Sequence, residues 1–153
     1  MQEARIEHSA LDRFAEKLEQ APQVMKEAKR HAFQAAAPRL LAAVRTEIGG
    51  SGKVQRWQGA YVGSKGGYAA ARPRAKTFAE DRRGRETKYA VGYVTNAINS
   101  GHGPPRNKAG YYASTRRVAG KQFYQRAQAR AEDVAQETGQ QIIQALKDHL
   151  EGG

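Results

Sequence analysis

Apolar residues recur at helical spacing near both ends of this chain. Close to the N-terminus, Leu11, Phe14 and Leu18 lie at positions i, i+3 and i+7, which places them on one face of an α-helix. We therefore expect a first, short helix over about residues 10–20. Pro22 is expected to end it, because proline lacks the backbone N–H that a helix interior requires.

A second and longer helix is predicted over about residues 22–48. Its apolar face recurs at spacings of mostly three and four, through Val24, Ala28, Ala32, Ala35, Leu40, Val44 and Ile48. Gly49 and Gly50 are expected to end it, because glycine accepts the left-handed backbone angles of a helix stop. Pro38 lies inside the pattern, so we expect a kink or a short break there, at a cost of about 3 kcal/mol.

The C-terminal part of the chain predicts a third helix over about residues 121–150. Its apolar face runs through Phe123, Ala127, Ala131, Val134, Thr138, Ile142 and Leu146. At 1.5 Å per residue the helix spans roughly 45 Å, longer than a small sheet needs. Its far end is expected to pack on the N-terminal helices or on another subunit.

Between the helices, residues 51–118 lose the helical period and contain short strand patterns. GAYVG and YAAARP are separated by the turn-forming SKGG, and the hydrophilic AEDRRGRET predicts a hairpin tip or a loop. YAVGYV (residues 89–94) predicts a buried strand, since it is uncharged and rich in β-branched and aromatic residues. A short helical turn capped by Thr95 and ended by Gly101 is expected to follow it.

These patterns predict an α+β fold in one domain, residues 1–153. It would contain the long N-terminal helix preceded by the short one, a small antiparallel sheet of two to four strands, and a long amphipathic C-terminal helix. Another strand could come from a partner. With 39% apolar residues, the chain should form a small core with solvated loops, or a subunit that completes its core in an oligomer.

Composition narrows the class of protein. The chain has no cysteine, so disulfides and thiolate chemistry are excluded. No apolar run approaches the roughly 18 residues of a membrane helix, and the N-terminus lacks the apolar core of a signal peptide. We expect a soluble, unsecreted protein without a membrane partner.

The positive charge is concentrated in the middle of the chain. Residues 51–88 carry a net charge of +7 and residues 101–126 carry +6, out of +11 in total. Residues 1–50 carry +1 and residues 127–153 carry −3. Such asymmetry suggests contact with a polyanion or with acidic partner surfaces.

Candidate catalytic chemistry is sparse. His102, in GHGPP close to Arg106 and Lys108, is the only histidine in a plausible site, but a nuclease would need a second acid or base that nothing nearby supplies. A turn histidine bonded to local backbone is the plainer interpretation. The histidines have no metal-ligand spacing, the carboxylates cluster on predicted helix surfaces, and SGK at residues 51–53 lacks the rest of a P-loop. We expect no enzyme activity, no metal and no cofactor.

Basic loops are the stronger signal. The candidates for contact with a polyanion or an acidic partner are Arg72, Arg74, Lys76, Arg82, Arg83, Arg85, Arg106, Lys108, Arg116 and Arg117. Arg72, Arg74 and Lys76 alternate as the solvent face of an edge strand would. Tyr111 and Tyr112 lie in the long loop 101–118 and could stack on bases. Direct contact with DNA and contact with an acidic protein surface both stay open.

Two short motifs resemble a known family. YAVGYVTNAINSGH (residues 89–102) and VAGKQFYQRA (residues 118–127) are separated by a basic variable loop and lie between a long N-terminal helix and an amphipathic C-terminal one. This order resembles the small head–tail joining proteins of long-tailed bacteriophages, also called neck or tail-completion proteins. The resemblance spans nearly the whole chain.

The resemblance implies an α+β subunit of a ring in the phage neck, assembled in the host bacterial cytoplasm and carried in the virion. The partners would be other copies of the chain, head-completion or connector proteins, and tail-tube or tail-terminator proteins. By the same analogy the turn after the strand is shaped by Asn96, Ile98, Gly101 and His102. The last helix is seated by Gly120, Phe123 and Tyr124.

We therefore expect a non-enzymatic structural virion protein that joins the DNA-filled head to the tail. The alternatives are a tail-terminator ring protein, or a small basic nucleic-acid-binding protein or RNA-targeting toxin. Non-specific contact with genomic DNA is a further hypothesis. Candidate aromatic anchors for ring contacts are Trp57, Tyr61, Phe78, Tyr111 and Tyr112.

Overall fold

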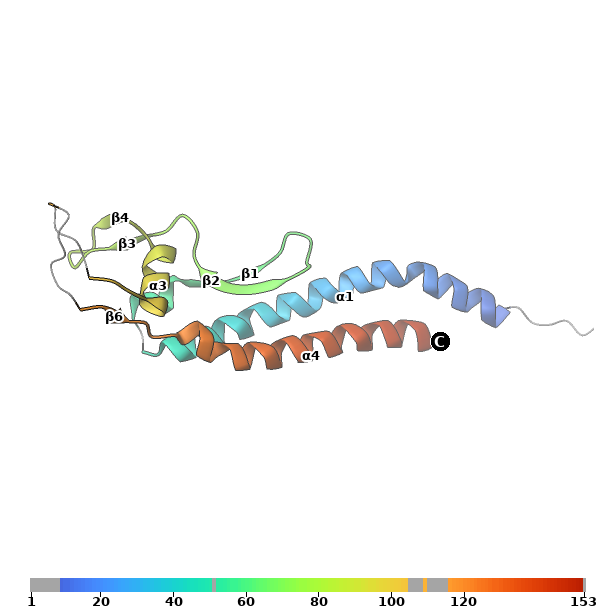
Figure 1. Cartoon of the computed structure of the whole chain (residues 1–153). Coiled ribbons are helices and arrows are strands. Elements are labelled where there is room, and N and C mark those ends of the chain that lie inside the picture. The colour runs from blue at the N-terminus through green and yellow to red at the C-terminus, as the bar shows by residue number, and fades with distance from the viewer. Residues whose placement is uncertain (1–8, 51, 105–108, 110–115, 153) are drawn as a thin grey trace, which may run out of the picture.

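A computed structural model describes residues 9–50, 52–104, 109 and 116–152. The fold is α+β, as predicted: two long helices lie side by side, and short strand pairs and a shorter helix gather at one end of them (Figure 1). The buried apolar side chains are mostly alanine and valine, with Phe123 the one large exception in the part of the chain described. The small predicted core is therefore confirmed.

The N-terminal helix, α1, is continuous from Ser9 to Ile48, so the predicted division at Pro22 is wrong. Of the kink or short break predicted at Pro38, the break is wrong, because the helix continues through that residue. Both prolines lie at exposed positions, while Ala36 and Ala37 beside Pro38 are buried. Packing of α1 against the rest of the fold offsets the lost backbone hydrogen bonds. Gly49 and Gly50, with φ of +73° and +63°, follow the helix as predicted.

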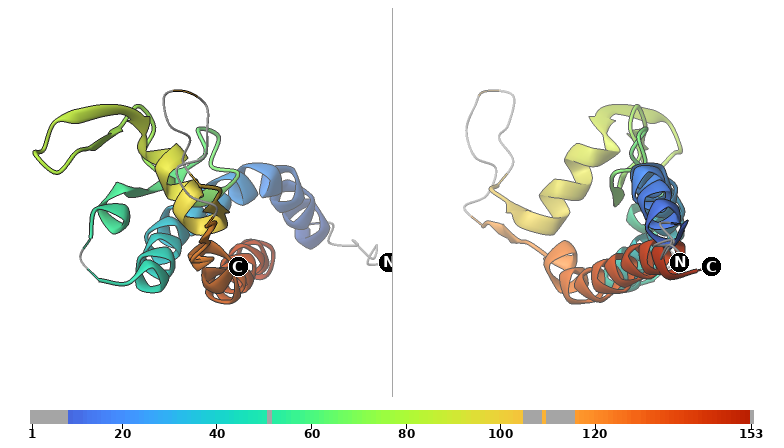
Figure 2. Two further views of the ribbon diagram at one scale, coloured as in Figure 1. Left: turned by 60° about the vertical axis from the view of Figure 1, so that its left-hand side comes forward. Right: turned by 90° about the vertical axis from the view of Figure 1, so that its right-hand side faces the viewer.

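The C-terminal helix, α4 (Phe123–Glu151), runs antiparallel to α1 along most of its length (Figures 1 and 2). Arg39 pairs with Glu137 at 2.6 Å near the middle, and His149 Nε2 lies 2.9 Å from the Lys17 carbonyl oxygen near the end. The prediction that the far end of the last helix packs on the N-terminal helix is confirmed. Its predicted face is buried at Phe123, Ala127, Val134 and Thr138.

The predicted hairpin with an SKGG turn is confirmed. After the short helix α2 (Lys53–Trp57), β1 (Gln58–Val62) pairs antiparallel with β2 (Ala69–Pro73), and the pair packs on α1. The predicted alternation of three basic residues along an edge strand is wrong beyond Arg72. Strand β2 ends at Pro73, so Arg74 and Lys76 lie in the connection that follows.

A second hairpin, β3 (Phe78–Glu80) with β4 (Glu86–Ala90), confirms the predicted tip at AEDRRGRET. The predicted strand over residues 89–94 is wrong beyond Ala90, where β4 ends, because helix α3 (Val91–Ser100) begins at Val91. The buried residues of α3 are Val91, Thr95 and Asn99, spaced by four, so a helical period prevails over the strand propensity of the segment. Thr95 lies inside this helix and does not cap it.

Gly101 ends α3 with φ of +83°, as predicted. Strand β5 (Gly101–His102) then pairs with β6 (Val118–Ala119), which leads into α4. The strands described thus form three separate antiparallel pairs. Residues 105–108 and 110–115, with the predicted candidates Arg106, Lys108, Tyr111 and Tyr112, lie outside the described residues.

Candidate protein interface

The start of α4 is held by a residue from α3. The backbone N–H of Tyr124 donates to the side-chain oxygen of Asn99 at 3.1 Å, the bond that an N-cap residue normally accepts. The residue at the N-cap itself, Gln122, has φ of +49° and makes no side-chain cap. Its N–H donates to the Asn99 carbonyl oxygen at 2.9 Å, and Lys121 N–H donates to that of Ile98 at 2.9 Å. The two predicted motifs therefore meet through Asn99.

Gly101 and Gly120 allow these two backbones to touch. A Cβ on Gly120 would lie 2.5 Å from the Asn99 carbonyl oxygen and 2.5 Å from the Ser100 carbonyl carbon. A Cβ on Gly101 would lie 2.6 Å from the Val118 carbonyl oxygen. Because these distances are shorter than real Cβ contacts, both positions require glycine.

A part-buried hydrogen bond ties this junction of α3 and α4 to the first hairpin. The Tyr124 hydroxyl donates to Gln58 Oε1 at 2.6 Å, and Gln58 Nε2 donates to the Val54 carbonyl oxygen at 3.2 Å. The Gln58 side chain is fully buried, so both polar ends need these partners. Burial raises the pKa of Tyr124 to about 12.

The predicted turn residues thus fall into two groups. Ile98, Gly101, Gly120, Phe123 and Tyr124 come together at this junction and serve the fold. Asn96 lies on the exposed surface of α3. His102 is also exposed, and its Nδ1 lies 2.8 Å from the Gly103 carbonyl oxygen, the local backbone contact expected of a turn histidine.

The predicted basic residues lie on several loops. Arg74, Lys76, Arg82, Arg83, Arg116 and Arg117 are exposed. Arg72 stacks over the Tyr61 ring at 4.5 Å, and Arg85 pairs with Asp81 at 2.9 Å. Backbone and side-chain hydrogen bonds from Arg85, with a further one from Arg83 N–H, hold the pKa of the Asp81 carboxyl below its usual range. The hairpin tip is therefore an ordered turn that carries excess positive charge.

Three exposed aromatic side chains lie on the second hairpin and the start of α3. Tyr89 and Tyr93 stack with ring centroids 6.1 Å apart and an interplanar angle of 17°, and they are 49% and 67% exposed. Phe78, which pairs with Ala90 across the hairpin, is also exposed. We call the stacked pair Tyr89 and Tyr93 the aromatic face. Lys88 Nζ lies 5.5 Å from the centroid of the Tyr89 ring.

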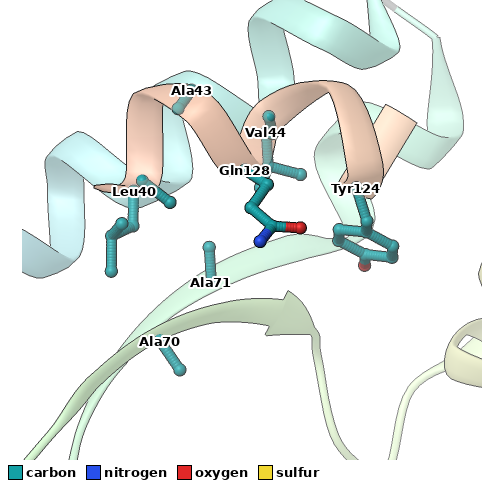
Figure 3. Close-up of a pocket in the computed structure, with 9 residues that line it drawn as sticks. Leu40, Ala43, Val44, Ala70, Ala71, Tyr124 and Gln128 are labelled. Carbon is teal, nitrogen blue, oxygen red and sulfur yellow. The ribbon is translucent and has the colours of Figure 1, made fainter. Parts of the chain in front are cut away.

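An apolar groove runs between α1, α4 and β2. Two adjoining hollows, of about 330 Å³ and about 450 Å³, share Leu40 and Ala131 in their walls. Figure 3 shows Leu40 of α1 and Gln128 of α4 pointing toward the strand that carries Ala71. We call this the alanine groove; its further walls include Ala43, Val44, Ala69, Ala70, Ala127, Val134, Ala135 and Gly139.

Of the predicted aromatic anchors, Phe78 is exposed, while Trp57 and Tyr61 are half-buried. Sequence reasoning missed the exposed Tyr89–Tyr93 stack because it assigned both residues to a buried strand. Their separation by four residues, across the start of a helix, is the signal that could have found them. The alanine groove was signalled only by the alanine-rich stretches of the two long helices.

Within the described part of the chain, no group of three or more His, Asp or Glu side chains could hold a metal ion. Among the same residues, no helix is long and apolar enough to cross a membrane. Comparisons with known protein families, with curated proteins and with solved structures found no match to this chain.

Proposed function

We propose that this chain is a non-enzymatic structural protein of a tailed bacteriophage or prophage, which joins the DNA-filled head to the tail as a subunit of a ring. The observation that carries the proposal is the placement of its large apolar side chains. Alanine and valine dominate the core, while the exposed large apolar residues include Leu11, Phe14, Leu18, Phe78, Tyr89, Tyr93 and Ile143. Surfaces of this kind are typical of association with other proteins.

The shape of the subunit supports this role. The α1–α4 pair forms a long arm, and the β3–β4 hairpin and α3 lie at the opposite end from Ser9 (Figures 1 and 2). Exposed apolar residues are present at both ends, at Leu11 and Phe14 on the arm and at Tyr93 on α3. A subunit with two separate contact surfaces can bridge neighbours, as a neck ring requires.

The proposal is tested with the proteins encoded beside it. The purified chain is mixed with the portal, head-completion, tail-tube and tail-terminator proteins of the same phage or prophage genome, and complexes are measured by light scattering and negative-stain electron microscopy. We expect ring-shaped complexes with at least one of these proteins. Absence of any complex would refute the head–tail role, and the partner that binds would separate a neck ring from a tail-terminator ring.

A basic nucleic-acid-binding protein is the second candidate, favoured by the exposed Tyr89–Tyr93 stack beside Lys88. Stacked aromatic rings flanked by cations bind single-stranded nucleic acid without sequence preference. This candidate predicts retention of DNA or RNA that falls steeply with salt and is lost in Tyr93→Ser. No retention at low salt would remove it.

A further inference from the structure

We propose that the end of this chain opposite Ser9 binds duplex DNA through the phosphate backbone, without sequence preference. The β3–β4 hairpin and β6 lie at this end (Figure 1). We call the exposed cations there, together with those in the connection before β3, the basic end: Arg74, Lys76, Arg82, Arg83, Lys88 and Arg117. The choice of duplex DNA rests on the head–tail role proposed above, whereas the phosphate contact rests on the placement of charge.

Positive charge is segregated between the two parts of the subunit. Residues 49–122, which contain all of the described strands, have 15 Lys or Arg and 3 Asp or Glu, a net charge of +12. Helix α1 has seven and five, and helix α4 has three and five, so the two-helix arm has no net charge. A field of this asymmetry orients the subunit with its basic end toward a polyanion.

Few carboxylates neutralise the basic end from within the chain. Residues 49–122 contain three of them, and Asp81 is paired with Arg85 at 2.9 Å, so Arg85 is not counted in the basic end. None of the six cations forms an ion pair with another residue that the structure describes, although Lys88 Nζ lies 5.5 Å from the centroid of the Tyr89 ring. They can therefore meet phosphates without giving up an internal pair.

The backbone at Lys76 points to the same surface. Lys76 has φ of +53°, in the left-handed region that is costly for a residue with a Cβ. Glycine or asparagine would hold this turn at a lower cost, so the geometry of the turn does not account for a lysine there. Backbone strain of this kind is concentrated at functional sites.

The dispersal of the cations favours nucleic acid over an acidic protein. They lie on the connection before β3, the hairpin tip, β4 and the residue before β6. Duplex DNA carries one charge per about 1.7 Å of helix axis, so cations on separate segments each find a phosphate. A protein partner would need its carboxylates placed opposite each cation, and the cores of protein interfaces are depleted of charged residues.

The first experiment measures binding of the full chain to a labelled duplex of mixed sequence by fluorescence anisotropy, over a range of salt concentrations. Six phosphate contacts predict that the logarithm of affinity falls with the logarithm of salt with a slope of about −5. Arg82→Gln combined with Arg83→Gln should weaken binding at least about tenfold at low salt and reduce that slope by about 2. Helical circular dichroism should not change, since both side chains are exposed.

The matched control removes the same charge from the arm. Lys26 and Lys29 are exposed on α1, and Lys26→Gln combined with Lys29→Gln should change affinity by less than about twofold and leave the salt slope unchanged. Equal losses in the two double variants would show that total charge governs binding and would overturn the assignment to the basic end.

A second double variant tests the connection before β3. Arg74→Gln combined with Lys76→Asn removes two charges, and asparagine suits the left-handed backbone at position 76. It should lower the salt slope by about 2, as the hairpin-tip variant does. A slope equal to that of wild type in both variants would overturn the inference.

Two further probes separate duplex DNA from the other polyanions. Tyr93→Ser, in the aromatic face, should leave affinity for the duplex unchanged within about twofold, because backbone binding does not use base stacking. Tighter binding to a single strand, lost in Tyr93→Ser, would overturn the duplex assignment in favour of the second candidate function. Displacement of the duplex by an equal charge concentration of poly-glutamate would overturn it in favour of an acidic protein.

The outcomes for this inference and for the head–tail role are independent. No binding to the duplex at low salt would overturn the inference, while ring complexes with head or tail proteins would still support the head–tail role. Conversely, duplex binding that depends on the basic end, without a complex with any head or tail protein, would refute only the head–tail role.

Discussion

The two hairpins of this chain use their side chains in opposite ways. The β1–β2 hairpin lies on α1 and brings small residues, Ala69, Ala70 and Ala71, to the helices. The β3–β4 hairpin extends from the far end of the fold and keeps Phe78 and Tyr89 exposed (Figure 2). Packing the chain onto itself therefore relies on small residues and backbone contacts, while its large rings remain available to a neighbour.

This difference between the two hairpins predicts that substitutions where α3 meets the start of α4 destabilise the fold. Substitutions on the β3–β4 hairpin should not. The largest effect is expected for Gly120→Ala. The new Cβ would meet backbone atoms of Asn99, Ser100 and Gly101, none of which can rotate away. We expect a loss of about 3 kcal/mol in the free energy of unfolding, measured by urea denaturation.

The matched control for that substitution is Gly67→Ala, in the turn of the first hairpin. A Cβ there would have no heavy atom within 4 Å. The control should change stability by less than about 0.5 kcal/mol. Equal effects of the two substitutions would show that the Gly101–Gly120 contact is not needed.

Asn99→Ala should have the next largest effect. It removes the acceptor for the Tyr124 N–H at the start of α4 and leaves that donor without its cap. Loss of a cap costs about 0.5–2 kcal/mol, and burial of Asn99 places the expected loss near the upper end. Asn96→Ala, on the exposed surface of the same helix, is the control; thermal unfolding compares the two.

Tyr124 should make stability depend on alkaline pH. Its pKa is raised from 10.0 to about 12 by burial, so the folded state favours the protonated hydroxyl. This contribution is full below pH 10 and is lost as the pH rises through about 12. Because the Tyr124 side chain is partly exposed, we discount the effect and expect the free energy of unfolding to fall by about 1–2 kcal/mol.

The comparison variant is Tyr124→Phe, which removes the titrating group and its bond to Gln58. It should be less stable than wild type at pH 8 by about 1 kcal/mol, and the difference should shrink by pH 11. Denaturant unfolding at the two pH values measures it. A difference that is constant with pH would contradict the raised pKa.

Thr95→Val should stabilise the chain slightly. Thr95 is fully buried, and its hydroxyl has no hydrogen-bond partner among the described residues. Replacing this hydroxyl with a methyl group of similar size removes an unsatisfied buried group, for an expected gain of about 1 kcal/mol. A loss on thermal unfolding would mean that the hydroxyl has a partner after all.

The smallest effect on stability is expected at the hairpin tip. Arg82→Glu and Arg83→Glu change exposed side chains in the β3–β4 turn, so each should alter the free energy of unfolding by less than about 0.5 kcal/mol. Both should weaken binding to any acidic surface or polyanion, with the difference fading at high salt. A large loss of stability would show that the projecting hairpin is part of the core.

The sequence predicted the two long helices well because their apolar residues repeat at helical spacing over many turns. It failed at Pro22, where it predicted that one helix ends, and it allowed a break at Pro38 that does not occur. At both prolines packing along α1 outweighs the local cost of the missing backbone hydrogen bond. It failed again at residues 91–94, because the helical spacing of the buried Val91, Thr95 and Asn99 prevails over the strand propensity of the β-branched and aromatic residues there.

The interface surfaces were harder to predict than the fold. The glycines and aromatic residues of the two motifs were identified from the chain, but their meeting through Asn99 depends on a contact between residues 25 positions apart. The alanine groove is formed by α1, α4 and β2 together, so no single stretch of sequence predicts it. The exposure of Tyr89 and Tyr93 depends on where α3 begins, which the strand assignment placed wrongly.

The unbroken length of α1 has a mechanical consequence. Forty residues at 1.5 Å each make a rod of roughly 60 Å, braced by α4 from its C-terminal end to about Lys17. Molecules bound at its two ends would therefore be kept a fixed distance apart, and a force on one end would be transmitted to the other. A circle of such rods would act as a stiff collar, whose height is set by the number of residues in one helix.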